Sequence, residues 1–447
     1  MAKERENYIC SSCGHTFPKW LGKCPQCQEW NTIVPLSHHP RKASQPKYLP
    51  LNQVPEEGEE RITLPFREIQ RVLGGGLVRG SLVLLGGEPG VGKSTLLLQI
   101  ASALSTMGEK ILYVSAEETL HQIKLRAKRL GSLPANLYLL QETRVEAILG
   151  QKELLKPGIM ILDSIQTVAL EDLPSSPGTV VQVREATARI LEAAKATNTT
   201  VILVGHVTKE GSLAGPKTLE HMVDTVLQIE GDKGQPYRLL RVIKNRYGPD
   251  MEVALLEMTG KGIEEVKDPS AIFLQERLQE TPGSVVVASL QGSKPLLLEV
   301  QALVSPSSLG IPRRVMAGVD PTRASFILAV IEKHLGLNLQ SLDLFLNIPG
   351  GIKLSEPGGD LAVLLSLVSS FREIPIEKDL AVFGEVGLGG EIRRVKGAIY
   401  RAREAEKHGF SGILLPKWDQ EKVAKECKIK LIGISNVREA LEFSMNL

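Results

Sequence analysis

The sequence predicts an α/β fold with a mostly parallel sheet, and two observations support this class. Between residue 61 and about residue 267, β-rich runs alternate with helical patterns, as in strand–helix–strand units. One run, Leu82–Leu85, leads through a glycine-rich turn into a helical pattern at 96–103. Helical spacing is clearest at 181–196. The other expected strands are 110–114, 159–162 and 201–204, followed by 226–229, 238–243 and 253–257, which read as a meander closing the sheet.

The glycine-rich turn fits the phosphate-cradling pattern Gly87-x-x-x-x-Gly92-Lys93-Ser94. Glycines let backbone amides surround a polyphosphate, and the helix expected to begin near Lys93 points its positive end at that charge. Lys93 would add a charge at the β- and γ-phosphates, and Ser94 would offer a hydroxyl to Mg²⁺. The flanking strand and helix favour this over a plain connecting turn. The predicted nucleotide-binding residues are Gly87, Glu88, Pro89, Gly90, Val91, Gly92, Lys93, Ser94 and Thr95.

Two carboxylates follow expected strands. Asp163 comes directly after the run 159–162, where it can hold Mg²⁺ through its water shell. Glu117 follows the run 110–114, where it can orient and deprotonate the water that attacks the γ-phosphate. A strand-ending acid alone is usually a helix cap. Together with the phosphate loop, the two carboxylates predict ATP hydrolysis with Mg²⁺.

The composition sets the organisation and the compartment. A chain of 447 residues is too long for one core, and 43% hydrophobic with 23% charged residues is typical of a globular protein. The formal net charge of +2 means that nucleic-acid binding would come from local patches. We find no apolar run of transmembrane length and no signal-peptide pattern at the start, so we expect a cytoplasmic protein with reduced cysteines.

Four of the five cysteines form two close pairs, Cys10-x-x-Cys13 and Cys24-x-x-Cys27. This spacing predicts one four-thiolate Zn²⁺ site in a small ribbon at 1–35, whose folding energy the metal would supply. A redox pair or two disulfides would suit a reducing cytoplasm less well. The proline-interrupted stretch 36–60 predicts a semi-extended linker before an ATPase domain at 61–267.

Three further features lie beyond the phosphate loop. Loops at 172–179 and 206–217 follow strands, where they would face the ligand side of the sheet; His206 is either a γ-phosphate sensor or structural. Lys209 and Lys217 could meet a phosphate backbone. Lys244 and Arg246 flank one residue of an expected strand and would share a face. They are either an exposed turn or positive fingers that reach a neighbouring subunit's ATP.

The order of these motifs, with Lys244-Asn-Arg-Tyr-Gly248, resembles the bacterial RadA (Sms) recombination proteins over essentially the whole chain. The resemblance implies a RecA-like ATPase core and a homohexameric, DNA-stimulated ATPase with DnaB-like helicase and branch-migration activity. It implies single-stranded and branched DNA and a RecA recombinase as partners, and heteroduplex extension in DNA repair. By motif position, Glu117 matches the water-activating carboxylate, Lys244 and Arg246 match a Lys-Asn-Arg motif, and 208–217 falls near a DNA-contacting loop.

The remaining half, 268–447, resembles the proteolytic domain of Lon proteases, which implies an α+β fold. We expect strands at 285–290 and 296–304, helices at 325–335 and 361–368, and a final strand at 413–415. Gly358 stands at the nucleophile position, so no covalent path exists and peptidase activity is not expected. Ile399 falls near the activating lysine's position, with Lys396 offset. Arg313, Arg314, Arg323, Arg393 and Arg394 are either a basic face or ordinary surface charge. A peptidase and a nucleotide-switched scaffold remain the alternative functions.

Overall fold

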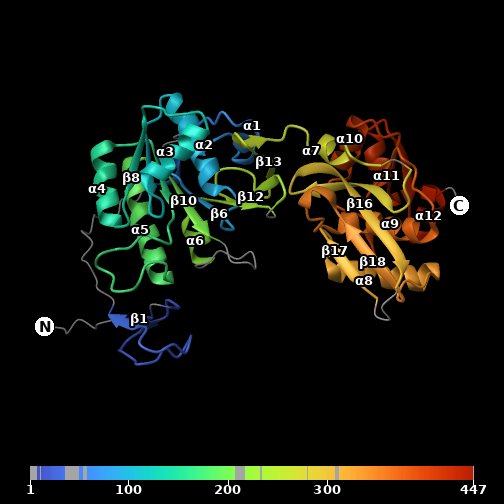
Figure 1. The fold of residues 1–447 in the computed structure, drawn as a ribbon, viewed down its shortest axis with the longest axis horizontal. Helices are drawn as coiled ribbons and strands as arrows, with labels where there is room; N and C mark the ends of the chain where they lie inside the picture. The colour runs from blue at the N-terminus through green and yellow to red at the C-terminus, as the bar shows by residue number, and fades with distance from the viewer. Residues whose placement is uncertain are drawn as a thin grey trace. The chain divides into compact units, whose positions relative to one another are not determined.

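The computed structural model describes residues 8–10, 12–35, 50–53, 58–206, 217–231, 234–278, 280–307 and 312–445. The chain forms two compact units, one of residues 1–230 with 238–265 and the other of 231–237 with 266–447 (Figure 1). Among the described residues, no helix is both long and apolar enough to cross a membrane. Most of the predicted linker 36–60 lies outside the described residues; within it, residues 51–53 form a short 3-10 helix, η1.

The N-terminal ribbon is a three-stranded antiparallel sheet of β1 (Tyr8–Cys10), β2 (Thr16–Phe17) and β3 (Ile33–Pro35), with β1 in the middle. Its buried residues are Ile9, Cys10, Cys24 and Ile33, of which the last three form one cluster. A core this small does not offset the conformational entropy of folding, so the ribbon needs a further source of stability.

A nine-stranded sheet forms the centre of the first unit. Its order is β14-β13-β12-β11-β6-β10-β9-β7-β8, and the strands from β11 to β8 run parallel. The predicted strands are all present, and β8 and β14 were not predicted. The bounds are β6 (Leu82–Gly87), β7 (Ile111–Ser115), β8 (Leu137–Gln141), β9 (Ile159–Asp163), β10 (Thr200–His206), β11 (Thr225–Glu230), β12 (Tyr237–Asn245), β13 (Val253–Thr259) and β14 (Gly262–Glu265).

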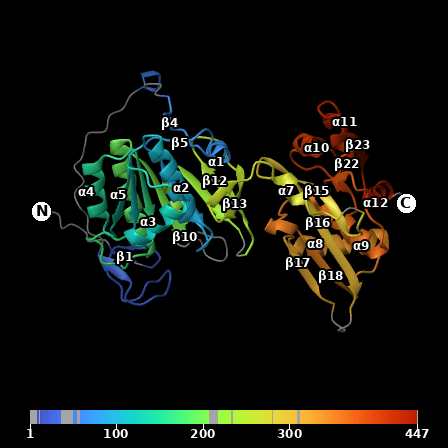
Figure 2. The same cartoon turned by 45° about the horizontal axis from the view of Figure 1, so that its top comes forward.

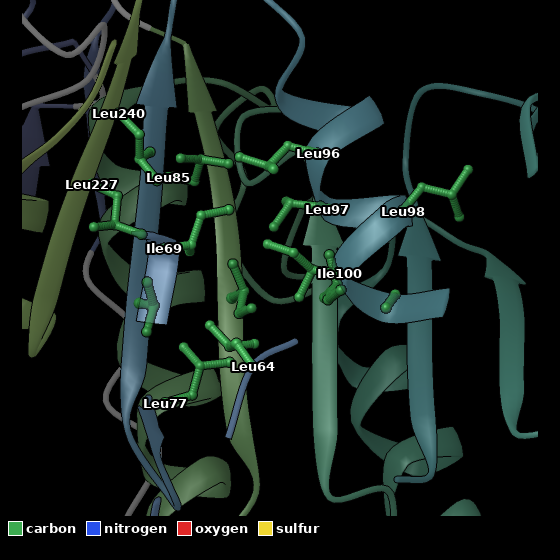
Figure 3. Packing of buried hydrophobic residues seen from close by; sticks show 14 of the residues in the cluster. Leu64, Ile69, Leu77, Leu85, Leu96, Leu97, Leu98, Ile100, Leu227 and Leu240 are labelled. Atoms are coloured by element: carbon green, nitrogen blue, oxygen red, sulfur yellow. The ribbon is translucent and has the colours of Figure 1, made fainter. Parts of the chain in front are cut away.

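Helices cover both faces of this sheet because alternate residues of each central strand point to opposite sides. Val83 and Leu85 of β6 belong to one hydrophobic cluster with α2, and Leu82 and Leu84 belong to a second with α5. Figure 3 shows Leu85 and Leu227 of the strands in the α2 cluster, with Leu96, Leu97 and Ile100 of the helix. The helices are α1 (Arg67–Val72), α2 (Lys93–Thr106), α3 (Leu120–Arg129), α4 (Val145–Leu155), α5 (Val180–Thr197) and α6 (Lys217–Met222); β4 (Arg61–Ile62) pairs with β5 (Leu77–Val78).

The second unit contains a seven-stranded mixed sheet of order β17-β18-β16-β15-β19-β22-β23 (Figure 2). The strand at 413–415 is present, but the prediction that it is final was wrong, because β23 pairs with it in parallel. The apolar residues of β23 include Gly433 and are mostly half-buried, whereas those of β22 are all buried. The strands of this sheet are β15 (Ser284–Gln291), β16 (Lys294–Pro306), β17 (Arg314–Ala317), β18 (Leu342–Asn347), β19 (Leu380–Val382), β22 (Gly412–Pro416) and β23 (Lys430–Ile434). β20 (Glu385–Val386) and β21 (Ile392–Arg393) form a separate two-stranded sheet.

Two helices of this unit were predicted. The expected helix at 325–335 is α8 (Pro321–Val330) continued by a π-helical turn at 331–335, and the expected helix at 361–368 is α9 (Asp360–Arg372). Residues 360–369 of α9 are all buried, which explains its continuous apolar sequence. The other helices are α7 (Pro269–Leu274), α10 (Ala398–Lys407), α11 (Lys417–Ala424) and α12 (Val437–Met445).

Candidate nucleotide and metal sites

The parallel strands place the predicted hydrolytic residues at one edge of the sheet. His206 of β10 lies opposite Gly87 of β6, and Asp163 of β9 lies opposite Ser115 of β7. Glu117 comes two residues after β7 ends. Ligands of open α/β sheets bind at this carboxyl edge, so the structure brings the phosphate loop and both carboxylates to the expected side.

The phosphate loop needs glycine at specific positions. Gly90 and Gly92 have φ of 83° and 114°, in the region that disfavours other residues. A Cβ on Gly87 would lie 2.8 Å from the carbonyl oxygen of Ile229 on β11, which is too close for a real contact. Arg238 of β12, which sequence reasoning missed, donates from Nε to the Val91 carbonyl oxygen at 3.2 Å. Strands β11 and β12 therefore support the loop from one side.

Lys93 begins α2 and is buried, with 5% of its surface exposed. Its Nζ donates to the carbonyl oxygens of Gly87 at 2.8 Å and Glu88 at 3.0 Å. Burial lowers its pKa, while the negative charges of Asp163 and Glu117 act to raise it. Both partners of Nζ in the loop are neutral carbonyl groups, so the ammonium charge stays available for an anion held in the loop.

A chain of polar contacts joins Lys93 to Glu117. Nζ of Lys93 lies 3.3 Å from Nδ1 of His206, and Nε2 of His206 lies 3.3 Å from Oε1 of Glu117. Ser164, at the end of the neighbouring strand, donates its hydroxyl to the same Oε1. Burial acts to raise the pKa of Glu117, but Ser164, His206 and Lys93 outweigh it and the pKa is lowered. The carboxylate is thus ionised at neutral pH, the state needed to accept a proton.

Asp163 lies at the end of β9, and its Oδ2 accepts a hydrogen bond of 2.8 Å from the hydroxyl of Tyr113. Burial, together with the negative charge of Asp163, raises the pKa of Tyr113 well above its ordinary value, so the phenol stays a donor. The bond fixes the carboxylate beside the phosphate loop. An oriented carboxylate together with the Ser94 hydroxyl is an oxygen donor set that suits Mg²⁺.

Lys244 and Arg246 lie elsewhere. Arg246 follows the end of β12, so the prediction that both cations lie within one strand was wrong; Asn245 is the last residue to pair with β11. Nζ of Lys244 donates to the carbonyl oxygens of Glu220 and Val223 at 2.7 and 2.8 Å. Arg246 pairs with Asp224, whose carboxylate also accepts the Leu82 amide. These contacts place the motif beside the amino end of β6, whereas the phosphate loop follows its carboxyl end.

The four cysteines converge in the ribbon. The Sγ atoms of Cys10 and Cys27 and those of Cys13 and Cys24 are both 3.6 Å apart, and all four lie within 4.8 Å of one another. Tetrahedral zinc with bonds of about 2.3 Å would separate its sulfurs by about 3.8 Å, so the cluster fits this ion. Burial, with the neighbouring thiols, raises the pKa of Cys13 to about 12. A bound cation removes this conflict between close thiolates.

Matching turns present the cysteine pairs. The amide of Gly14 donates to the Cys10 carbonyl at 2.9 Å, and the amide of Gln28 donates to the Cys24 carbonyl at 2.8 Å. Gly14 and Gln28 both have positive φ, of 75° and 60°. The repeated Cys-x-x-Cys spacing therefore corresponds to a repeated backbone turn, as a shared metal requires.

The second unit holds a different arrangement around Gly358, the middle residue of the 3-10 turn Pro357–Gly359 that leads into α9. A Cβ at this position would lie 2.9 Å from Nη1 of Arg401, which is wholly buried. Arg401 forms a two-contact ion pair with Glu356 and donates to the Ala288 and Lys396 carbonyls. The cation beside Gly358 is therefore Arg401, and not Lys396 or a residue at position 399. Sequence reasoning missed it because arginine was not the expected residue type.

Four of the five arginines considered for a basic face form ion pairs: Arg313 with Asp343, Arg323 with Asp360, Arg393 with Glu391 and Arg394 with Asp419. Their charges are largely compensated, which favours ordinary surface charge. Residues 207–216, with Lys209, and the side chain of Lys217 lie outside the described residues, so the predicted DNA-contacting loop is not described.

Comparison with known proteins matches three parts of the chain to family models. Residues 8–35 match a rubredoxin metal binding domain, residues 49–212 match an AAA domain, and residues 327–419 match subunit ChlI of Mg-chelatase. These matches confirm the fold class, with its zinc ribbon, P-loop core and Lon-like C-terminal domain. The AAA domain supports ATP hydrolysis, and the ribbon match supports Zn²⁺.

Full-length relatives cover the whole chain. The DNA repair protein RadA of Bacillus subtilis is 46% identical over 100% of both chains. That of Aquifex aeolicus is 47% identical over 99% of both, and that of Listeria monocytogenes is 46% identical over 99% of this chain and 98% of its own. A KaiC-like protein of Pyrococcus horikoshii covers 47% of this chain and 100% of its own, at 20% identity and a TM-score of 0.41.

Proposed function

Because this chain belongs to the RadA family of DNA repair proteins, we propose that it is a DNA-dependent ATPase with helicase and branch-migration activity on recombination intermediates. One observation carries the proposal: the polar chain from Lys93 through His206 to Glu117, at the carboxyl edge of a parallel sheet. It links the group that would hold the γ-phosphate to the group that would activate water. A change at the phosphate would therefore reach the water-activating carboxylate through one imidazole.

In the proposed mechanism, residues Gly87–Thr95 bind the phosphates of ATP, with Lys93 on the γ-phosphate. Glu117 orients the attacking water and accepts its proton. His206 moves with the γ-phosphate and reports its state to Glu117. Ser94 and Asp163 would hold Mg²⁺, which would supply positive charge to neutralise the phosphates.

We assign Lys244 and Arg246 to a neighbouring subunit's ATP in a homohexamer. Val226 of β11 lies opposite Lys244 of β12 on one side and Leu84 of β6 on the other. Leu84 is three positions before Gly87, where the phosphate loop begins. Strand geometry separates positions three residues apart by about 10 Å, and the loop extends away from there. The motif is thus poorly placed for its own phosphates. The proposed partners are single-stranded and branched DNA and a RecA recombinase, in the cytoplasm.

The proposal is tested by ATP turnover of the purified chain with and without single-stranded DNA. We expect single-stranded DNA to stimulate turnover by the unmodified chain. The variant Glu117→Gln should still bind ATP but show no turnover, with or without DNA. Branch-migration assays on three-strand intermediates should give the same dependence. Normal DNA-stimulated turnover in Glu117→Gln would overturn the water-activation role.

The trans assignment has its own test. Arg246→Ala should bind ATP but lose most turnover, on the order of 10³-fold. Mixing it with Lys93→Ala creates interfaces in which an intact loop faces an intact finger, and partial recovery is expected. If the two variants co-assemble without any recovery, the motif acts within one subunit.

We also propose that the C-terminal domain is not a peptidase. Position 358 lacks a hydroxyl, and Arg401, held by Glu356, lies against it. An arginine stays protonated and does not act as a general base. Casein incubated with the chain and ATP is expected to remain intact; its degradation would overturn this assignment.

A further inference from the structure

The ribbon carries two large aromatic side chains that lie outside its core. Trp20 is 57% exposed and Trp30 is 69% exposed. The ribbon's own core consists of Cys10, Cys24 and Ile33, with Tyr8, Phe17 and Leu21 among the residues packed against it. Neither indole belongs to that core. In a module of this size, two exposed indoles point to a binding surface.

Both indoles are positioned by the same dipeptide, Gly22–Lys23. A Cβ on Gly22 would lie 3.6 Å from Cη2 of Trp20, so this ring lies close to the glycine. Lys23 pairs with Trp30 through an antiparallel bridge, and its ammonium nitrogen is 5.6 Å from the centroid of a Trp30 ring. The Asn31 amide donates to the Gly22 carbonyl at 2.9 Å. We call Trp20, Lys23 and Trp30 the ribbon face.

Lys23 places one ammonium group within this face, where it can meet an anion. The stretch 8–35 contains two lysines, Lys19 and Lys23, both exposed, against one acidic residue, Glu29. The Glu29 carboxylate already accepts the Ser12 hydroxyl. Indole faces bind nucleobases by stacking without regard to sequence, and a neighbouring ammonium can meet a backbone phosphate.

We infer that the ribbon face binds unpaired bases of single-stranded DNA, which stack on Trp20 and Trp30 while Lys23 lies beside a phosphate. This inference rests on the proposed function, since it names a DNA contact of the same protein. Stacking requires bases that are not paired with a second strand. The ribbon face would therefore select single-stranded over duplex DNA.

The first test compares Trp20→Ala, Trp30→Ala and the double variant in the full-length, zinc-loaded chain. The probes are oligo(dT) and an abasic oligonucleotide of equal length, which keeps the phosphates and lacks the bases. Each substitution is expected to weaken oligo(dT) binding about tenfold, because one stacked base is lost, and to leave binding of the abasic strand unchanged. Trp418→Ala removes an indole that is 73% exposed in the other unit and serves as the matched control.

The second test uses fluorescence. The chain has three tryptophans, so Trp418→Phe leaves Trp20 and Trp30 as the only sources of tryptophan emission. Oligo(dT) is expected to quench their emission, and the abasic strand is not. Zinc content and ATP turnover without DNA should equal those of the unmodified chain in every variant, which separates a lost contact from a misfolded ribbon.

The outcomes separate this inference from the proposed function. If the unmodified chain binds oligo(dT) but the double variant binds it equally well, the ribbon inference is wrong and the function stands. Equal weakening on both probes, or an absence of quenching, also overturns the stacking assignment. If the unmodified chain does not bind oligo(dT), both proposals fall.

Discussion

Lys93 in the first unit and Arg401 in the second are both buried cations next to a glycine segment that leads into a helix. Their partners differ. Nζ of Lys93 contacts two neutral carbonyl groups and the His206 imidazole. Arg401 is paired with Glu356, bonded to two further carbonyls, and lies 5.5 Å from the ring centroid of Phe383.

The difference shows what makes a buried charge available for chemistry. A cation whose partners are neutral keeps its charge available for a ligand. The charge of a cation with a fixed carboxylate partner is already neutralised by that partner. The first arrangement is costly in the folded protein, and binding of an anion offsets that cost. The second is a structural ion pair. Three substitutions test this contrast, and a fourth tests the Asp163 carboxylate beside Lys93.

Removing Lys93 should have the largest effect on turnover. Lys93→Ala removes the ammonium charge that would contact the γ-phosphate, and we expect ATP hydrolysis to fall by at least about 10²- to 10³-fold. Lys152 is the matched control, since it is also buried and donates to the Ala193 carbonyl and the Thr197 hydroxyl. Lys152→Met should lower stability and keep turnover per folded molecule. Equal loss of turnover in both variants would contradict the contrast.

Removing Arg401 should have the largest effect on stability. Arg401→Ala leaves the Glu356 carboxylate without its partner, and we expect a loss of about 3–5 kcal/mol in the unfolding free energy of the second unit. Urea unfolding followed by circular dichroism measures it. Arg403 pairs with Glu426 in an exposed position, so Arg403→Ala should cost less than about 1 kcal/mol. Similar losses of unfolding free energy in the two variants would show that the buried ion pair contributes no more to stability than the exposed one.

Restoring a hydroxyl at position 358 should weaken the second unit without creating a peptidase. In Gly358→Ser the new Cβ would meet the Arg401 guanidinium, which Glu356 prevents from moving away. We expect a loss of about 1–3 kcal/mol from overpacking. Gly260→Ser, where a Cβ would meet no atom within 4 Å, is the control. Casein cleavage by Gly358→Ser would refute the structural assignment of Arg401.

The smallest effect is expected at Tyr113. Tyr113→Phe removes the hydrogen bond to Asp163 while keeping the buried ring. One such bond to a charged group contributes about 1.5–3 kcal/mol, part of which water replaces here, so we expect a change of roughly tenfold or less in the Mg²⁺ concentration for half-maximal turnover. An unchanged Mg²⁺ requirement would show that Asp163 does not help to hold the metal.

The sequence predicted those parts that depend on local patterns. Residues 87–95 and the four cysteines are short motifs with fixed spacing, and the strands around them are continuous apolar runs. The contacts of Tyr113, Arg238 and Arg401 escaped prediction because each joins residues far apart in the chain. Strand β8 was missed although its sequence, Leu137-Tyr-Leu-Leu-Gln141, is mostly apolar; as the edge strand of the sheet it is only half-buried or exposed. His206 was noticed, but only the fold shows that its ring connects Lys93 with Glu117.

The hairpin of β11 and β12 touches the phosphate loop at one end, through Ile229 and Arg238, and carries Lys244 at the other. A paired strand ladder is stiff, so its two ends move together. In the proposed hexamer, each hairpin would connect the nucleotide site of its own subunit with the nucleotide site of the neighbouring subunit. Hydrolysis would then proceed from subunit to subunit around the ring in a fixed direction. The stiffness of the hairpin would determine the order in which the subunits hydrolyse ATP. A single subunit would have no such order.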